Sequence, residues 1–131
     1  MATIRDFREL RCWQEARLIA KNVYSLTYCK PFAKDFGLRD QVQRAAVSIG
    51  SNIAEGFERD SNAELVKFLS YAKGSAGEVI SQLYTAYDVG YISQQDLESM
   101  VSHLKTLGAS IASFQAVAKR ATVRGLMHRK D

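Results

Sequence analysis

An apolar repeat at three- and four-residue spacing runs through almost the whole chain and limits the fold more than any other feature. It falls in four stretches, at residues 10–28, 38–55, 61–90 and 93–118. This spacing places apolar side chains on one face of an α-helix, whereas no stretch alternates with the two-residue period of a half-buried strand. A single proline in 131 residues also favours long helices. The pattern predicts an all-α fold, an antiparallel up-down-up-down four-helix bundle over residues 1–118.

Local signals predict where these helices begin and end. Pro31 ends the first helix, because proline disfavours helix at the residue before it, and leaves a loop over residues 30–36. Gly56 stands where a left-handed cap would end the second helix. The tetrapeptide Ser61–Glu64 is a capping box that begins the third helix, and Ser93 can cap the fourth.

Small residues interrupt the apolar faces of the last two predicted helices. Gly74 and Gly77 lie inside the third helix, where each glycine costs roughly 1 kcal/mol relative to alanine. Close approach of a neighbouring helix is the explanation we favour. A glycine-rich phosphate loop is the alternative, but the spacing matches neither nucleotide-binding fingerprint and no strand precedes it. An alanine strip on the fourth helix offers a second surface for close packing: Ala109, Ala112 and Ala116.

A row of polar residues lies beside the apolar face of the second helix: Arg44, Ser48, Asn52 and Glu55. Polar groups are tolerated at a buried interface only when they are hydrogen-bonded. We therefore expect this row to form a structural polar network with Glu78 of the third helix, in which Arg44 and Glu78 are partners or share partners. Removing one member of a buried charged pair costs about 3–5 kcal/mol, so an Arg44→Ala variant is predicted to melt at a much lower temperature.

The same residues also admit a catalytic interpretation, since two carboxylates near an arginine could in principle transfer protons. However, no activated nucleophile is evident, and the two histidines, His103 and His128, are far apart in the chain. No Glu-x-x-His pair suggests the di-metal centre of some helical bundles. We expect no enzymatic activity, no catalytic residues, no metal and no cofactor.

The net charge of +4 is unevenly distributed along the chain. Residues 1–44 carry nine basic and five acidic side chains, residues 45–118 carry four and eight, and residues 119–131 carry five and one. The last segment is predicted to be a basic tail, either a solvated, disordered end or a nucleic-acid-binding segment. On the second interpretation the binding residues are the tail cations, extended by two residues one turn apart on the first helix: Lys119, Arg120, Arg124, Arg129, Lys130, Arg17 and Lys21.

No targeting or membrane segment is evident. No apolar run approaches the roughly 20 residues of a membrane span, and residues 1–9 lack the apolar core of a signal peptide. Cys12 and Cys29 fall on different faces of one predicted helix, which suggests neither a disulfide nor a metal motif. These features predict a cytoplasmic protein.

The motifs of the second and third helices resemble the signature of the four-helix-bundle family of 23S ribosomal RNA intervening-sequence proteins. The resemblance covers about residues 7–111 and rests on these residues: Leu38, Arg44–Ile49, Ser51–Gly56, Arg59, Phe68, Ala72–Ser75 and Glu78. Two features depart from the family pattern. Gly50 stands where proline is common, and the loop at residues 30–36 lacks the frequent Pro-x-x-Glu sequence.

The resemblance implies a cytosolic bundle without established enzymatic activity, and some such proteins are encoded inside inserted segments of 23S ribosomal RNA genes. Related bundles serve as accessory proteins of diversity-generating retroelements, in basic rings of five subunits that engage nucleic acid and a reverse transcriptase. The basic tail is not part of the family signature.

Two functions are therefore expected from the sequence, both for a non-enzymatic homo-oligomer. The first is weak binding or scaffolding of RNA or DNA without sequence specificity. The second is a protein-interaction or accessory module that makes no contact with nucleic acid. The basic first third and acidic middle of the chain suit a heterologous contact that closes into a ring, and only the family resemblance supplies the number five.

Overall fold

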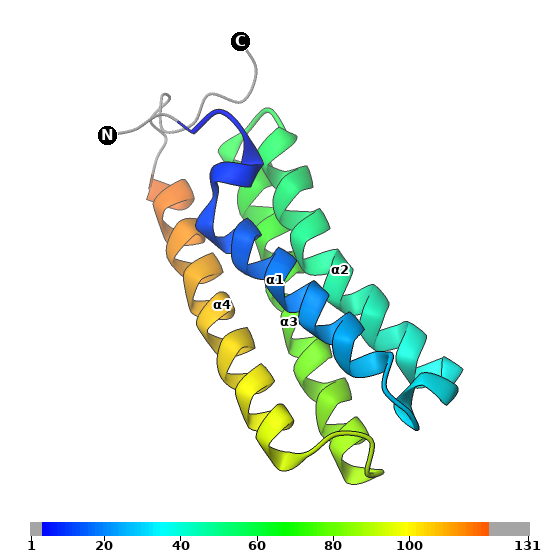
Figure 1. Ribbon diagram of the computed structural model, residues 1–131. Coiled ribbons are helices and arrows are strands. Elements are labelled where there is room, and N and C mark those ends of the chain that lie inside the picture. Colours follow the sequence, from blue (N-terminus) through cyan, green and yellow to red (C-terminus); the bar gives the residue numbers. More distant parts are fainter. Residues whose placement is uncertain (1–3, 121–131) are drawn as a thin grey trace.

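The computed structural model describes residues 4–120, and within them the chain forms a four-helix bundle (Figure 1). The four helices are α1 (Arg11–Thr27), α2 (Phe36–Glu58), α3 (Asn62–Asp88) and α4 (Gln94–Arg120). Short 3-10 helices precede α1 and α2, at Phe7–Glu9 (η1) and Phe32–Lys34 (η2). Each helix packs antiparallel to the one before it, so α1 begins at the end of the bundle where α4 finishes (Figure 1). The predicted all-α four-helix bundle is confirmed.

Side-chain caps set three of the helix starts. Ser61 Oγ accepts a hydrogen bond from the Glu64 amide at 3.1 Å, and Ser93 Oγ accepts one from the Asp96 amide at 3.0 Å, as the sequence predicts. A third cap was not expected: Asp35 Oδ1 accepts from the Leu38 amide at 3.1 Å. Because this bond satisfies a free amide of the first turn, α2 begins at Phe36, two residues before the predicted start.

The ends of α2 and α3 use glycine in different ways. Gly90, after α3, has a φ of 87°, and the following amide of Tyr91 donates to the Ala86 carbonyl at 2.8 Å, which is a Schellman cap. Gly56 was predicted to cap α2 in the same manner, and that prediction is wrong, because α2 continues to Glu58 with Gly56 buried inside it. A Cβ built on Gly56 would lie 2.8 Å from Cβ of Phe68. Glycine is needed there for the close approach of α2 and α3.

The glycines of α3 also differ from the prediction. Gly74 and Gly77 are exposed, and a Cβ built on either one meets nothing within 4 Å in the described part of the chain. No neighbouring helix of the same chain therefore explains these two residues.

Leucine, isoleucine, valine and alanine side chains from all four helices form one buried core. Phe32 of η2 enters this core fully buried and stacks on Tyr91 of the α3–α4 connection, with ring centroids 5.2 Å apart. Gln115 of α4, 7% exposed, donates from Nε2 to the Val66 carbonyl at 3.0 Å and to Ser70 Oγ at 2.7 Å. The apolar faces thus hold the bundle together, while this glutamine ties α4 to α3.

Among the described residues, none of the helices is both long enough and apolar enough to cross a membrane.

Candidate nucleic-acid interface

A groove on the outer surface of the bundle lies between α1 and α2. It has a volume of about 490 Å³. Tyr24 lines it from α1, and α2 contributes the remaining residues: Asp40, Gln43, Arg44, Val47, Ser48 and Ser51. Most of the α2 residues recur at three- and four-residue intervals, so a single helix carries them on one side, away from its buried face.

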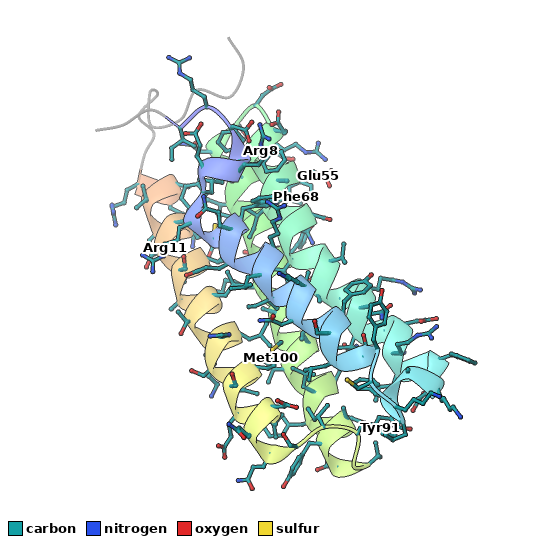
Figure 2. The ribbon with its side chains drawn as sticks, viewed as in Figure 1. Arg8, Arg11, Glu55, Phe68, Tyr91 and Met100 are labelled. Atoms are coloured by element: carbon teal, nitrogen blue, oxygen red, sulfur yellow. The ribbon has the colours of Figure 1, made fainter. Side chains whose placement is uncertain are left out.

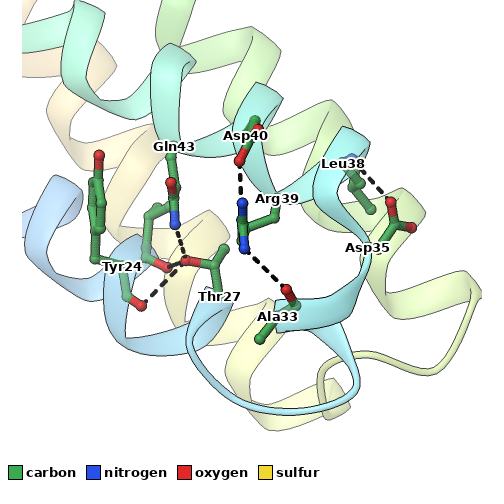
Figure 3. A network of polar contacts seen from close by, with 9 residues as sticks. Tyr24, Thr27, Ala33, Asp35, Leu38, Arg39, Asp40 and Gln43 are labelled. Carbon is green, nitrogen blue, oxygen red and sulfur yellow. Dashed lines mark hydrogen bonds and ion pairs between the residues drawn. The ribbon is translucent and has the colours of Figure 1, made fainter.

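A buried threonine anchors one side chain of the groove, Gln43. Gln43 Nε2 donates to Thr27 Oγ1 at 2.9 Å, and the Thr27 hydroxyl is itself shared between the carbonyls of Val23 and Tyr24 at 2.9 and 3.2 Å (Figure 3). Thr27 is completely buried, so its hydroxyl needs both a donor and an acceptor inside the protein. The bond holds the Gln43 amide in place and ties α1 to α2 at this level.

The one carboxylate that lines the groove is already paired. Arg39 Nε donates to Asp40 Oδ1 at 2.9 Å, and another nitrogen of the same guanidinium donates to the Ala33 carbonyl at 3.1 Å (Figure 3). The Arg39 guanidinium also lies 4.7 Å from the centroid of the Phe36 ring. Because these contacts hold Arg39 beside Asp40, the negative charge of the groove is offset locally.

Arg44 lies on the rim of this groove, not in a buried network. It is exposed, and its side chain forms no ion pair or hydrogen bond with any residue of the described chain. Glu78 of α3 is exposed as well. The buried Arg44–Glu78 pair that the sequence predicts is therefore not formed between residues 4 and 120. The physical reason is the rotation of α2, which brings Ser48 to Ser75 of α3 and leaves Arg44 exposed to solvent.

The rest of the predicted polar network is divided. Ser48 Oγ lies 2.6 Å from Ser75 Oγ of α3 and 2.9 Å from its own helix's Ala45 carbonyl, so it links two helices. Asn52 Nδ2 donates to the Ser48 carbonyl at 2.9 Å, within α2. Glu55 is exposed at the end of the bundle near Phe68 (Figure 2), where it pairs with Arg59 at 2.8 Å. Of the hydrogen bonds and ion pairs that these predicted residues form within residues 4–120, only the Ser48–Ser75 contact joins α2 to α3.

The structure describes four of the seven basic residues that were predicted to bind nucleic acid. Arg17 and Lys21 are exposed on α1, with the Arg17 guanidinium 5.6 Å from the centroid of the Trp13 ring. Lys119 and Arg120 are exposed in the last turn of α4, so the helix extends two residues into the segment predicted as tail. Arg124, Arg129 and Lys130 lie outside the described residues.

Sequence reasoning named only Arg44 and Ser48 as site residues and missed the other five that line the groove: Tyr24, Asp40, Gln43, Val47 and Ser51. Their signal was weak: Val47 is an apolar residue off the apolar face, and it follows Gln43 by one helical turn. The lining contains no histidine or cysteine, and its one carboxylate is paired. Across residues 4–120 no cluster of three histidine, cysteine or acidic side chains could hold a metal. The groove brings together one cation, Arg44, with polar side chains of α2 and the aromatic ring of Tyr24.

Comparisons with known proteins agree with the fold. The family model described as 23S rRNA-intervening sequence protein matches residues 8–113. One similar solved structure is a protein of unknown function from the S23 ribosomal protein family of Bacteroides thetaiotaomicron. It has a TM-score of 0.74 and 23% sequence identity, over 80% of this chain and 95% of that one. No curated protein matches the sequence.

Proposed function

We propose that this chain, which belongs to the 23S rRNA-intervening sequence protein family, is a non-enzymatic, oligomeric protein of the cytoplasm that binds or scaffolds nucleic acid. RNA is the ligand we favour, bound weakly and without sequence specificity. The observation that carries the proposal is an exposed set of cations on α1 and α2 that lack acidic partners.

The acidic residues of the first third of the chain are largely engaged. Asp6 pairs with Arg8 at 2.8 Å and Glu15 with Arg11 at 3.3 Å, and Asp40 is held by Arg39. The Arg8 guanidinium hydrogen-bonded to Asp6 lowers the pKa of that carboxyl to about 2, which is the effect expected of an engaged ion pair.

Three exposed cations of α1 and α2 have no acidic partner among the described residues. Arg17 and Lys21 of α1 and Arg44 of α2 are exposed and enter no ion pair with the described residues. Cations of this kind bind phosphates and release counterions, which gives affinity that falls steeply with salt. Lys119 and Arg120 in the last turn of α4 add two exposed cations, and the sequence beyond residue 120 adds three more basic residues.

Oligomerisation belongs to the proposal because a few cations on one chain would bind weakly. Several copies in one assembly would act together through effective concentration. We expect a closed homo-oligomer, with five subunits on the family resemblance alone. The exposed glycines of α3 leave room for a close contact with another subunit. Light scattering at micromolar concentration that detects only the 14.6 kDa chain would exclude the assembly.

The binding test compares four proteins on labelled ribosomal RNA fragments at low and moderate salt. The first two are the full chain and a truncation ending at Ala118. The other two are double variants: the α1 variant Arg17→Gln/Lys21→Gln and the matched control Lys67→Gln/Lys73→Gln. The control removes the same charge from exposed positions of α3.

We expect the truncation and the α1 variant to bind more weakly than the control. Each lost phosphate contact should flatten the dependence of log affinity on log salt by roughly 0.7–0.9. The proposal would be contradicted if RNA affinity did not change with salt concentration. It would also be contradicted if the α3 control variant lost as much affinity as the α1 variant.

A protein-interaction module is the second candidate, and a groove of about 640 Å³ between α3 and α4 favours it. Its lining includes the partly exposed rings of Tyr84 and Tyr87 together with Leu97 and Val101. Aromatic residues are enriched at protein interfaces. Absence of RNA binding, combined with salt-insensitive capture of a defined protein, would favour this function.

A further inference from the structure

We infer that the α1–α2 groove takes one unstacked base of a single-stranded nucleic acid, with the adjoining phosphate on Arg44. The inference rests on the proposed function and adds to it a distinction between single strands and duplexes. It also gives a role to a side chain that the sequence assigned to a structural network.

Two side chains with apolar surface line the groove, one from each helix. Tyr24 supplies an aromatic ring from α1, and the ring of Tyr28 packs edge-on against it with centroids 5.9 Å apart. Val47 lines the same groove from α2 and is 44% exposed. The faces of a nucleobase are apolar, so a base placed against Tyr24 and Val47 would cover both side chains. Stacking on an aromatic ring tolerates any base, because every base has a π-face.

Polar groups lie where the edge of the base and its phosphate would be. The Gln43 amide is oriented by its bond to Thr27, which leaves its oxygen and one N–H for the base edge. Arg44, next in the chain, has no partner in the described residues and presents a guanidinium at the rim. Ser51 adds an exposed hydroxyl, whereas the Ser48 hydroxyl is occupied by Ser75 and the Ala45 carbonyl.

The aromatic ring and the size of the groove favour a single strand over a duplex. Its volume of about 490 Å³ falls within the roughly 300–1,000 Å³ of small-ligand sites. In an A-form duplex the bases are paired and stacked, and the deep major groove keeps side chains away from them. A splayed base can stack on Tyr24, whereas a duplex would meet the surrounding cations through its phosphates alone.

The experiment measures binding of the full-length protein to an oligouridylate and to a duplex RNA of equal length. Tyr24→Leu removes the aromatic ring from the groove, and Val47→Ser removes the apolar side chain of α2. Arg44→Gln removes the cation. Tyr84→Leu is the matched control, since Tyr84 is a half-exposed tyrosine of α3 on another face. Thermal melting of each variant checks that the bundle is folded.

We expect Tyr24→Leu to weaken oligouridylate binding about fivefold or more, in line with the measured range for stacked bases. Duplex binding should change less than twofold. Val47→Ser should also weaken oligouridylate binding more than duplex binding, but by a smaller factor. Arg44→Gln should weaken the binding of both RNAs. Tyr84→Leu should leave both unchanged.

Three results would overturn the inference, and they differ in what they say about the proposed function. The base site alone is refuted if wild-type binding depends on salt but Tyr24→Leu, Val47→Ser and Tyr84→Leu all bind the oligouridylate equally well. The base site alone is also refuted if the wild-type protein binds the duplex more tightly than the oligouridylate. If wild-type protein binds neither RNA in a salt-dependent way, the proposed function fails and the base site fails with it.

Discussion

The hydroxyl of Tyr91 donates a hydrogen bond to Oδ2 of Asp35 at 2.9 Å, across 56 positions of sequence. The same carboxylate caps α2 through the Leu38 amide, and the Tyr91 ring stacks on Phe32. The pair therefore fastens the loop before α2 to the α3–α4 connection, at the end of the bundle where Tyr91 is labelled in Figure 2.

This contact makes stability depend on pH. The Leu38 amide, and secondarily the Tyr91 hydroxyl, lower the pKa of Asp35 in the folded protein. A lowered folded pKa contributes stability above the ordinary aspartate pKa, and that contribution is lost as pH falls through the folded value. Tyr91→Phe should therefore lower the melting temperature at neutral pH, by an amount that shrinks at acid pH. Calorimetry across pH measures this, with Asp35→Asn as a control that keeps a capping side chain. A difference that grows toward acid pH would contradict the assignment.

Gly56 is predicted to tolerate no side chain. A Cβ at this position would lie 2.8 Å from Cβ of Phe68 and 3.3 Å from Cδ1 of Leu65. Gly56→Ala should therefore destabilise the protein by about 1–3 kcal/mol, as overpacking does, although alanine favours helix. Urea unfolding monitored by circular dichroism gives the value. A more stable Gly56→Ala variant would show that α2 and α3 can separate without cost.

Gly74→Ala is the matched contrast within the next helix. Gly74 is exposed and has no atom of the described chain within 4 Å of an added Cβ. Alanine should stabilise the helix by about 0.5–1 kcal/mol, because it restricts the unfolded chain and favours helix. The same unfolding experiment applies, with the oligomeric state measured beside it. Loss of stability together with dissociation would instead place another subunit over Gly74.

The two cysteines should react at very different rates. Cys12 is 3% exposed, and burial raises the pKa of its thiol to about 11, whereas Cys29 is exposed. The thiolate is the reactive form, so iodoacetamide at mildly alkaline pH should alkylate Cys29 and leave Cys12 unmodified until the protein unfolds. Mass spectrometry of the native and urea-treated protein counts the adducts. Equal labelling of both residues in the native protein would refute the burial of Cys12.

Arg44→Ala is now expected to leave stability nearly unchanged, within about 0.5 kcal/mol, because surface substitutions without partners have small effects. The sequence alone had predicted a large loss. Thermal melting decides between the two, and weaker RNA binding by the same variant would agree with the groove. A melting temperature that falls sharply would mean that Arg44 has a partner in the assembled protein.

The sequence by itself determined the class of fold and where two of the helices begin. Apolar residues at three- and four-residue spacing can be buried only if each helix turns one face to a common core, which leaves few alternatives to a bundle. Ser61 and Ser93 cap their helices as predicted because capping is local, involving a side chain and an amide three residues away.

Only the tertiary structure decided what lies beside each apolar face. Successive residues of a helix are separated by about 100°, so a small rotation of α2 moves a polar row between an interface and solvent. That rotation is set by the packing of all the helices, including the contact of Gly56 with Phe68, and no local pattern records it. It placed Ser48 against Ser75, left Arg44 exposed, and brought Tyr24 and Val47 to the two sides of one groove.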